Sequence, residues 1–266
     1  MRNTAIIALC AALIGCGETT TKAPEAAKGL VIGKAATLPA TPGDPAWQGV
    51  APATVPLLPQ DVTEPRLTDG VKEVEVRAVG DGTSVAWRLS WADPTQDDGL
   101  GVTRFADGCA VQLPSTGGPD VPDSMMGQPG RPVRITLWKA IWQAVAGGKE
   151  QTIARLYPNA LIDHYPHGDH VAAVVSGNSM ATLPGGRVTQ DLVAEGFGSL
   201  SPAPEQTSKG AGAWADGKWS VVVVTAAPPS PRSYAAFAVW DGAGRQTGAR
   251  KMRSDWVGTT AEGGAP

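Results

Sequence analysis

Short runs of alternating apolar and polar residues, each closed off by Gly, Pro, Asn or Asp, dominate this sequence and restrict its fold. Residues 71–79 (V-K-E-V-E-V-R-A-V) alternate in the pattern of a strand with one solvated face, and residues 84–91 do the same. Gly80-Asp81-Gly82 between them predicts a hairpin turn. Further strands are predicted at residues 110–113, 133–139, 171–175, 219–225 and 234–240.

Helical periodicity is absent over any long stretch. The 33 Gly and 23 Pro residues instead space short β-rich runs, so we expect an all-β fold, an antiparallel β-sandwich with long loops. The helices expected are short ones near residues 154–162 and 189–195. The nine tryptophans are expected mainly to fill the core, with the indole N–H groups hydrogen-bonded.

The N-terminus has the pattern of an export signal. Arg2 precedes an apolar run, residues 5–14, that is too short to span a bilayer, so residues 1–15 are predicted to be a signal peptide. The run ends in Leu13-Ile14-Gly15-Cys16, which resembles the bacterial lipobox, where a cysteine is lipidated and becomes the first mature residue. We therefore expect a lipid anchor at Cys16, on the periplasmic side of the cell envelope.

The rest of the chain is predicted to hold a tether and one domain. Residues 16–43 are rich in Thr, Ala, Lys, Pro and Gly, a composition typical of a flexible tether. Residues 44–266 suffice for a single β domain with one core. Cys109 is the only cysteine of that domain, which excludes an intrachain disulfide, c-type haem attachment and iron–sulfur ligation. With 22 basic and 25 acidic residues and no basic cluster, nucleic acid is not an expected partner.

A series of segments between about residue 44 and residue 256 carries a resemblance to a known family. In order, the segments are Asp44-Pro45-Ala46-Trp47, Arg88-Leu89-Ser90-Trp91-Ala92-Asp93, Phe105-Ala106-Asp107-Gly108-Cys109-Ala110-Val111-Gln112-Leu113-Pro114, Met126-Gly127, Trp138-Lys139-Ala140, Ala194-Glu195-Gly196-Phe197-Gly198, Trp219-Ser220-Val221-Val222 and Ala238-Val239-Trp240-Asp241-Gly242. Together they resemble the haem b-binding γ subunits of periplasmic molybdenum enzymes related to dimethyl sulfoxide reductase. These enzymes include ethylbenzene dehydrogenase, dimethyl sulfide dehydrogenase, selenate reductase and chlorate reductase.

The resemblance implies one non-covalent haem b, held between a methionine thioether and a lysine amine. Met126 matches the family's Met-Gly position, and Lys251 matches its Lys-x-x-Ser-x-Trp position. Met125 is the nearest rival ligand because it adjoins Met126. The implied role is electron transfer between an iron–sulfur β subunit, attached to a molybdopterin α subunit, and an external redox partner such as a periplasmic cytochrome c.

Two alternatives stay open. His164, His167 and His170 lie within one short segment and offer a metal site or another source of an axial ligand, although Pro166 and Gly168 prevent a regular helix there. A lipid-anchored β-sandwich that binds sugars or another ligand through exposed tryptophans, without haem, is the alternative function. The sequence has no nucleophile elbow, phosphate-binding loop or paired-carboxylate motif, so we do not expect the chain to be an enzyme by itself.

Overall fold

The structure is a computed structural model that describes residues 29–99, 101, 103–118, 120–149, 158–159 and 182–263. Within these residues there is one α-helix, α1 (Ala140–Ala146), and two short 3-10 helices, Pro45–Gly49 and Pro184–Gly186. The strands are β1 (Leu30–Lys34), β2 (Ala53–Pro56), β3 (Leu58–Pro59), β4 (Glu73–Gly80), β5 (Ser84–Ala92), β6 (Gly108–Pro114), β7 (Val133–Lys139), β8 (Thr189–Ala194), β9 (Ser201–Pro202), β10 (Lys209–Ala215), β11 (Lys218–Ala226), β12 (Arg232–Trp240), β13 (Met252–Arg253) and β14 (Val257–Ala261).

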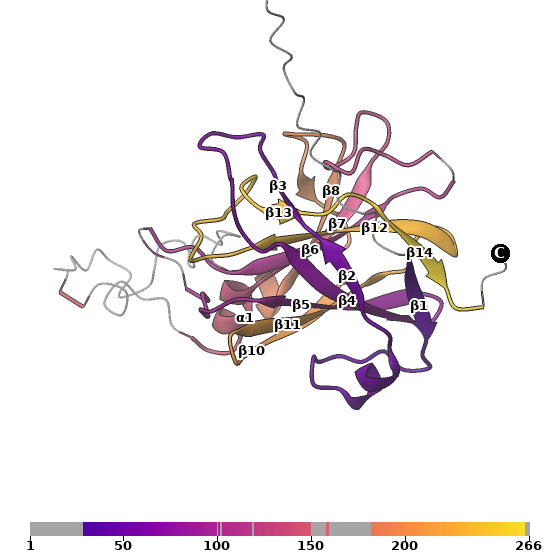
Figure 1. Ribbon diagram of the computed structural model, residues 1–266, viewed down its shortest axis with the longest axis horizontal. Helices are drawn as coiled ribbons and strands as arrows, with labels where there is room; N and C mark the ends of the chain where they lie inside the picture. The colour runs from indigo at the N-terminus through magenta and orange to yellow at the C-terminus, as the bar shows by residue number, and fades with distance from the viewer. Residues whose placement is uncertain are drawn as a thin grey trace, which may run out of the picture.

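A strand that changes partners along its length joins the two layers of the fold. The main path of the sheet is β10-β11-β5-β4-β1-β14-β12-β6-β7-β8-β9. The first half of β12 pairs with β14, up to Ala235↔Val257, and its second half pairs with β6, from Ala236↔Gln112 onward. Figure 1 shows the layer of β6, β7 and β12 above that of β4, β5 and β11. The expected all-β sandwich is confirmed.

The alternating runs form strands where they were predicted. Strands β4, β5, β6, β7, β11 and β12 correspond to six of the predicted strands, with ends that differ by at most two residues. Asp81 makes the β4–β5 hairpin as expected, because its carboxylate accepts hydrogen bonds from the backbone N–H groups of Thr83 and Ser84, both at 2.8 Å. Gly82 takes the left-handed φ of 98° that the turn requires. The strand predicted at residues 171–175 lies outside the described residues.

The helix predictions were less accurate. Residues 189–195 were expected to be helical, yet Thr189–Ala194 is strand β8, which pairs with β7 from Thr189↔Trp138 to Ala194↔Val133. A segment this short is not stable as an isolated helix, and an adjacent strand supplies it with a full set of hydrogen bonds. The helix expected at residues 154–162 falls outside the described residues apart from 158–159. The one α-helix that is described, α1, follows β7 directly and was not predicted.

The segment expected to be a tether contributes a strand to the sheet. Strand β1 pairs in parallel with β14 on one side and with β4 on the other, and Leu30 and Ile32 are buried. The tether prediction is therefore wrong for Leu30–Lys34, and the sheet is mixed rather than wholly antiparallel. The apolar run is only three residues long, and its partner β14 lies more than 200 residues away, so local sequence provided no reason to expect the pairing.

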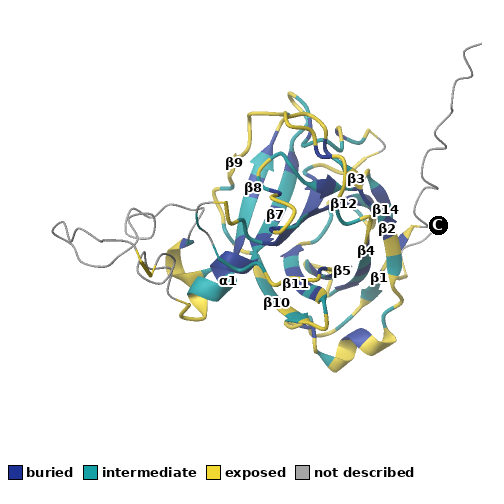
Figure 2. Ribbon diagram, turned by 60° about the vertical axis from the view of Figure 1, so that its left-hand side comes forward, coloured by how far each residue is buried: buried dark blue, intermediate teal, exposed yellow. Residues whose placement is uncertain are grey.

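Tryptophans fill the core, as predicted. Six of the nine are almost completely buried, and four of these belong to the main core: Trp87, Trp91, Trp138 and Trp219. None of the nine is fully exposed. In Figure 2 the strands are mainly buried or half-buried, and much of the exposed chain lies in the loops. Trp219 packs edge-on against Trp138 and is stacked on Trp91, with ring centroids 5.2 and 6.4 Å apart. The exposed row of tryptophans that the sugar-binding alternative requires is thus not present. Cys109 is buried among them as a free thiol, and burial raises its pKa.

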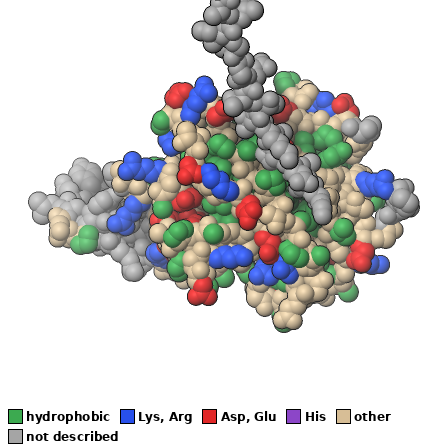
Figure 3. Space-filling model, viewed as in Figure 1, with side chains coloured by type: hydrophobic (Ala, Val, Ile, Leu, Met, Phe, Trp, Pro, Cys, Tyr) green, Lys and Arg blue, Asp and Glu red, His purple; other side chains and the backbone are tan. Residues whose placement is uncertain are grey.

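The surface carries mixed charge. On the face drawn in Figure 3, the Lys and Arg side chains are interspersed with Asp and Glu rather than gathered into a basic patch. No helix among the described residues is long and apolar enough to cross a membrane.

Candidate cofactor site

The layer that contains β6, β7 and β12 has one face toward the core and one face away from it. The face away from the core forms the floor of a cavity of about 900 Å³. In β6 and β12 the side chains alternate, so that one set packs into the core and the other faces this cavity. Cys109 and Val111 belong to the core set, and so does Phe237, although the cavity touches it as well. The cavity set is made of small residues, Gly108, Ala110, Ala236 and Ala238, with Gln112 and Trp240 at the ends of the strands.

Small side chains on the floor leave room for a flat ligand. Ala110 and Ala238 lie opposite each other in the β6–β12 pairing, and Gly108 lies opposite Trp240. Ile135, Leu137 and Leu192 extend the apolar floor onto β7 and β8. Phe197 and Leu200, two of the few large apolar side chains exposed on the described surface, also line the cavity.

Met126 lies on the wall of this cavity, in the loop between β6 and β7. Its φ of 75° is in the left-handed region, which is uncommon for a residue other than glycine. The Met126 carbonyl accepts a 2.8 Å hydrogen bond from Gly196 N–H, and Gly127 N–H donates to the Asp123 carbonyl at 2.9 Å. These bonds hold the strained backbone in place, as is common at ligand-binding sites.

Lys251 lines the same cavity from the segment between β12 and β13. Its carbonyl accepts a 2.9 Å hydrogen bond from Gln60 N–H, and its Nζ lies 5.4 Å from the centre of the Trp240 ring. Burial, helped by the nearby positive charge of Arg253, lowers the pKa of Lys251 from 10.5 to about 8. Loss of the proton leaves a lone pair on the amine, which a metal ion can then use.

Hydrogen bonds connect the two segments that carry Met126 and Lys251. Trp256 Nε1 donates to the Pro122 carbonyl at 2.7 Å, and Ser124 Oγ donates to Asp255 Oδ1 at 3.2 Å. The Ser124 carbonyl also accepts from Gln112 Nε2 at 2.9 Å, which fixes the Met126 loop to β6. The structure thus brings together two residues that are far apart in the sequence.

The cavity is positively charged as well as apolar. Among the described residues that line it there is no Asp or Glu, whereas four side chains are cationic: Arg104, Lys139, Lys251 and Arg253. A ligand that combines a flat apolar body with negative groups matches this lining.

Lys139 is a second lysine in the cavity, and the sequence analysis did not single it out. It ends β7 and lies over Trp142, with its Nζ 5.1 Å from the ring centre. Burial lowers its pKa too. Side chains alternate along β7, so Lys139 faces the same side as Ile135 and Leu137. That spacing was the signal in the sequence that Lys139 lies on the cavity side.

The rival ligands have different surroundings. Of the three methionines in the described residues, only Met126 lines the cavity. Met125 is not among the lining residues, and Met252 is buried in the main core. The histidines at 164, 167 and 170 and the cysteine at 16 lie outside the described residues.

Comparison with known proteins decides the family. The family model described as "Ethylbenzene dehydrogenase" matches residues 44–252, a span that includes Met126, Lys251 and the floor of the cavity. The chain belongs to the ethylbenzene dehydrogenase family. A similar protein from Haloferax mediterranei, named "Putative respiratory nitrate reductase heme subunit ORF7", is 24% identical over 232 residues, which is 82% of this chain and 67% of that protein.

Haem is the cofactor named in that relative. The size, lining and donor atoms of the cavity in this ethylbenzene dehydrogenase family member can each be compared with those that haem requires. A volume of about 900 Å³ is within the usual range for sites that enclose organic ligands. The floor of Gly and Ala accommodates a flat ring, and the cationic lining suits carboxylates. The described residues that line the cavity also provide one soft sulfur, from Met126, and two amines of lowered pKa, from Lys139 and Lys251, as donors for the haem iron. The residues present fit the group.

Proposed function

We propose that this chain is the haem b-binding, electron-transfer subunit of a molybdopterin oxidoreductase complex, with Met126 and Lys251 as the axial ligands. The observation that carries the proposal is that both residues, 125 positions apart, line one apolar, cationic cavity. Family membership and the haem subunit named among its relatives support it.

Met126 and Lys251 play different chemical roles in this proposal. Bound haem would supply a one-electron redox centre. The Met126 thioether, a soft donor, favours the reduced state and raises the reduction potential. The Lys251 amine binds only after it loses its proton, and burial makes that loss easier by lowering its pKa to about 8.

We further propose that the chain relays electrons rather than transforming a substrate. Its partners would be an iron–sulfur subunit attached to a molybdopterin subunit, and an external carrier such as a periplasmic cytochrome c. The apolar Phe197 and Leu200 at the cavity would be shielded when the cofactor is bound.

The lipid anchor at Cys16 is the localisation part of the proposal. It rests on the Leu-Ile-Gly-Cys ending of the apolar run and on the positive charge of Arg2. It would place the complex at the periplasmic surface of a membrane.

The ligand assignment is tested by visible spectroscopy of five variants of the purified protein. Met126→Ala and Lys251→Ala should each shift the Soret band and abolish the low-spin spectrum, and Met126→Ala should lower the reduction potential. Met125→Ala and Lys139→Ala are the matched controls, because they remove the same two side-chain types, one from the residue next to Met126 and one from elsewhere in the cavity lining. A low-spin spectrum that survives Lys251→Ala but not Lys139→Ala would transfer the role to Lys139. If His167→Ala alone abolishes it, both assignments are wrong.

A further inference from the structure

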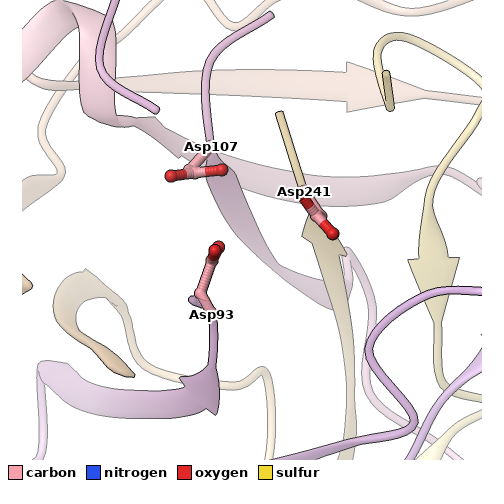
Figure 4. A group of neighbouring side chains, drawn as sticks. All are labelled: Asp93, Asp107 and Asp241. Carbon is pink, nitrogen blue, oxygen red and sulfur yellow. The ribbon is translucent and has the colours of Figure 1, made fainter. Parts of the chain in front are cut away.

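Three carboxyl groups meet at the ends of three strands. Asp93 follows β5, Asp107 precedes β6 and Asp241 follows β12. One oxygen of each lies within 4.8 Å of the corresponding oxygens of the other two. Asp93 and Asp107 are buried, Asp241 is half-buried, and Asp93 directs its carboxyl group toward the other two (Figure 4).

Asp107 is held in position by N–H donors. Its Oδ2 accepts hydrogen bonds from Asp97 N–H at 2.7 Å and from Trp219 Nε1 at 2.8 Å, and its Oδ1 accepts one from Gly242 N–H at 2.8 Å. Donors of this kind stabilise the ionised form of a carboxyl group and fix its orientation. Supporting hydrogen bonds of the same type orient the carboxylate ligands of metal ions.

Asp93 provides an independent observation, because one of its oxygens has no hydrogen-bond partner. The residue is 2% exposed, its Oδ1 accepts from Thr95 N–H at 3.2 Å, and its buried Oδ2 has no hydrogen-bond partner among the described residues. The Trp91 indole N–H lies near enough to lower the pKa of Asp93, but it makes no hydrogen bond that occupies Oδ2. A buried carboxylate oxygen in this state is costly unless an ion or a water molecule binds it.

The cluster has no ion-pair partner in the part of the chain that the structure describes. Among the described residues no Lys or Arg forms an ion pair with any of the three carboxyl groups. Burial, opposed by the Gly242 N–H but reinforced by the charge of Asp93, raises the pKa of Asp107 to about 7. Burial raises the pKa of Asp93 as well. Protons or a bound cation would neutralise the three carboxyl groups.

We propose that Asp93, Asp107 and Asp241 bind a divalent cation and that calcium is the ion that fits. All three ligands are carboxylate oxygens, with no His or Cys among them, which favours a hard ion over zinc or copper. Calcium binds oxygens at about 2.4 Å, so ligands on opposite sides of the ion are about 4.8 Å apart, and its irregular geometry lets water complete the shell.

The bound cation would connect the end of β5 in one layer to the ends of β6 and β12 in the other, next to the cavity. Asp107 follows two cavity-lining residues, Phe105 and Ala106, and Asp241 follows Trp240, which starts the loop that leads to Lys251. The chain is tightly packed at this point, since a Cβ on Gly242 would lie 2.2 Å from the Phe105 carbonyl oxygen. The bound ion therefore stabilises the base of the Lys251 loop, whatever the cavity itself binds.

The test uses the purified full chain, first stripped with EGTA. Titration with CaCl₂ in a calorimeter should show saturable binding with about one calcium per chain. Calcium at about 100 times its dissociation constant should raise the melting temperature by about 5–10 °C, a readout that does not depend on haem. Asp93→Asn, which keeps the size of the side chain, should weaken calcium binding at least tenfold.

Two further variants keep the test decisive. Asp241→Asn removes the least buried ligand and should lose calcium binding while the fold remains, even if Asp93→Asn does not fold. Asp44→Asn is the control, because Asp44 only caps the Pro45–Gly49 helix and asparagine caps equally well. The proposal is overturned if calcium produces no heat and no rise in melting temperature, and equally if magnesium alone does so. It is also overturned if Asp93→Asn stabilises the chain regardless of calcium, as expected for a shared proton.

Discussion

At the scale of single residues, the Met126 loop depends on a glycine that no other residue replaces easily. Gly127 has a φ of 76°, and a Cβ there would lie 2.8 Å from the Arg131 carbonyl oxygen and 3.0 Å from that of Ala194. Both contacts are with backbone, which cannot rotate away. Steric contacts thus explain why glycine follows Met126 in this fold: any larger residue would prevent the loop from closing as tightly as it does around Met126.

Gly127→Ala should therefore destabilise the chain by about 2–4 kcal/mol, combining left-handed strain with the backbone clash. Denaturant unfolding measures the loss. Gly130→Ala is the matched control, since Gly130 has the same φ of 76° but nothing within 4 Å of the added Cβ. Equal losses in the two variants would show that packing around Gly127 contributes nothing.

The buried ammonium of Lys251 gives the cofactor-free chain a specific pH dependence. Its pKa is about 8 when folded and near 10.5 when unfolded, so between these values the unfolded chain binds more protons and stability rises with pH. Below pH 8 both states are protonated and the cost of burying the charge is fully present.

Lys251→Met removes this charge and should be more stable than the parent chain below about pH 8. The difference should shrink as the pH rises from 8 to 10.5, and thermal unfolding of the two haem-free proteins across that range measures it. A difference that does not vary with pH would mean that the Lys251 amine is solvated in solution.

At the scale of elements, one strand pair makes both the core and the cavity. The alternation in β6 sends Cys109 and Val111 into the core and Ala110 outward, and β12 does the same with Phe237 and Ala238. The large residues stabilise the sandwich while the small ones leave space above it. The cavity can thus be filled without disturbing the core.

Ala110→Leu should fill the floor and reduce haem content at least tenfold while the far-ultraviolet circular dichroism stays unchanged. The added side chain projects into the cavity rather than into the close-packed interior. Ala213→Leu makes the same change on the exposed side of edge strand β10 and should bind haem normally. Full haem content in Ala110→Leu would show that the cofactor does not lie over this strand pair.

The hydrogen bond from Trp256 to the Pro122 carbonyl connects the two segments that carry the proposed ligands. Trp256→Phe keeps an aromatic ring beside Tyr234 but removes the N–H donor, so haem should dissociate about 2–10 times faster. Transfer of haem to excess apomyoglobin measures the rate. Trp47→Phe is the control, because it removes an N–H bonded to the Thr41 carbonyl in a small apolar cluster that does not line the cavity, and it should leave the rate unchanged.

At the scale of the whole molecule, a subunit that only carries electrons needs partners. Affinity purification of the chain from its native host under gentle conditions should recover an iron–sulfur protein and a molybdopterin protein. A haem-loaded monomer recovered alone would contradict this part of the proposed function. Cys16→Ser should leave unprocessed precursor in the same host, and normal cleavage would refute lipidation.

The sequence by itself determined the class of fold and six of the fourteen described strands, among them most of the longest. Alternation is a local property, so β4, β5 and β7 could be predicted from their own residues, and so could the Asp81 hairpin. Met126 and Lys251 came from family resemblance, because a loop methionine and a lysine near the end of a chain carry no local signal of ligation. Their placement on one cavity is consistent with that resemblance.

Only the tertiary structure decided the features that depend on distant partners. Strand β1 forms because β4 and β14 accept it on both edges, and β8 is a strand because β7 lies beside it. Asp93, Asp107 and Asp241 carry no local signal in their three separate segments and meet only when their strand ends converge. Burial raises the pKa of Asp93 and Asp107, and that burial depends on contacts between strands that are far apart in the sequence. The raised pKa values therefore arise only when the layers pack.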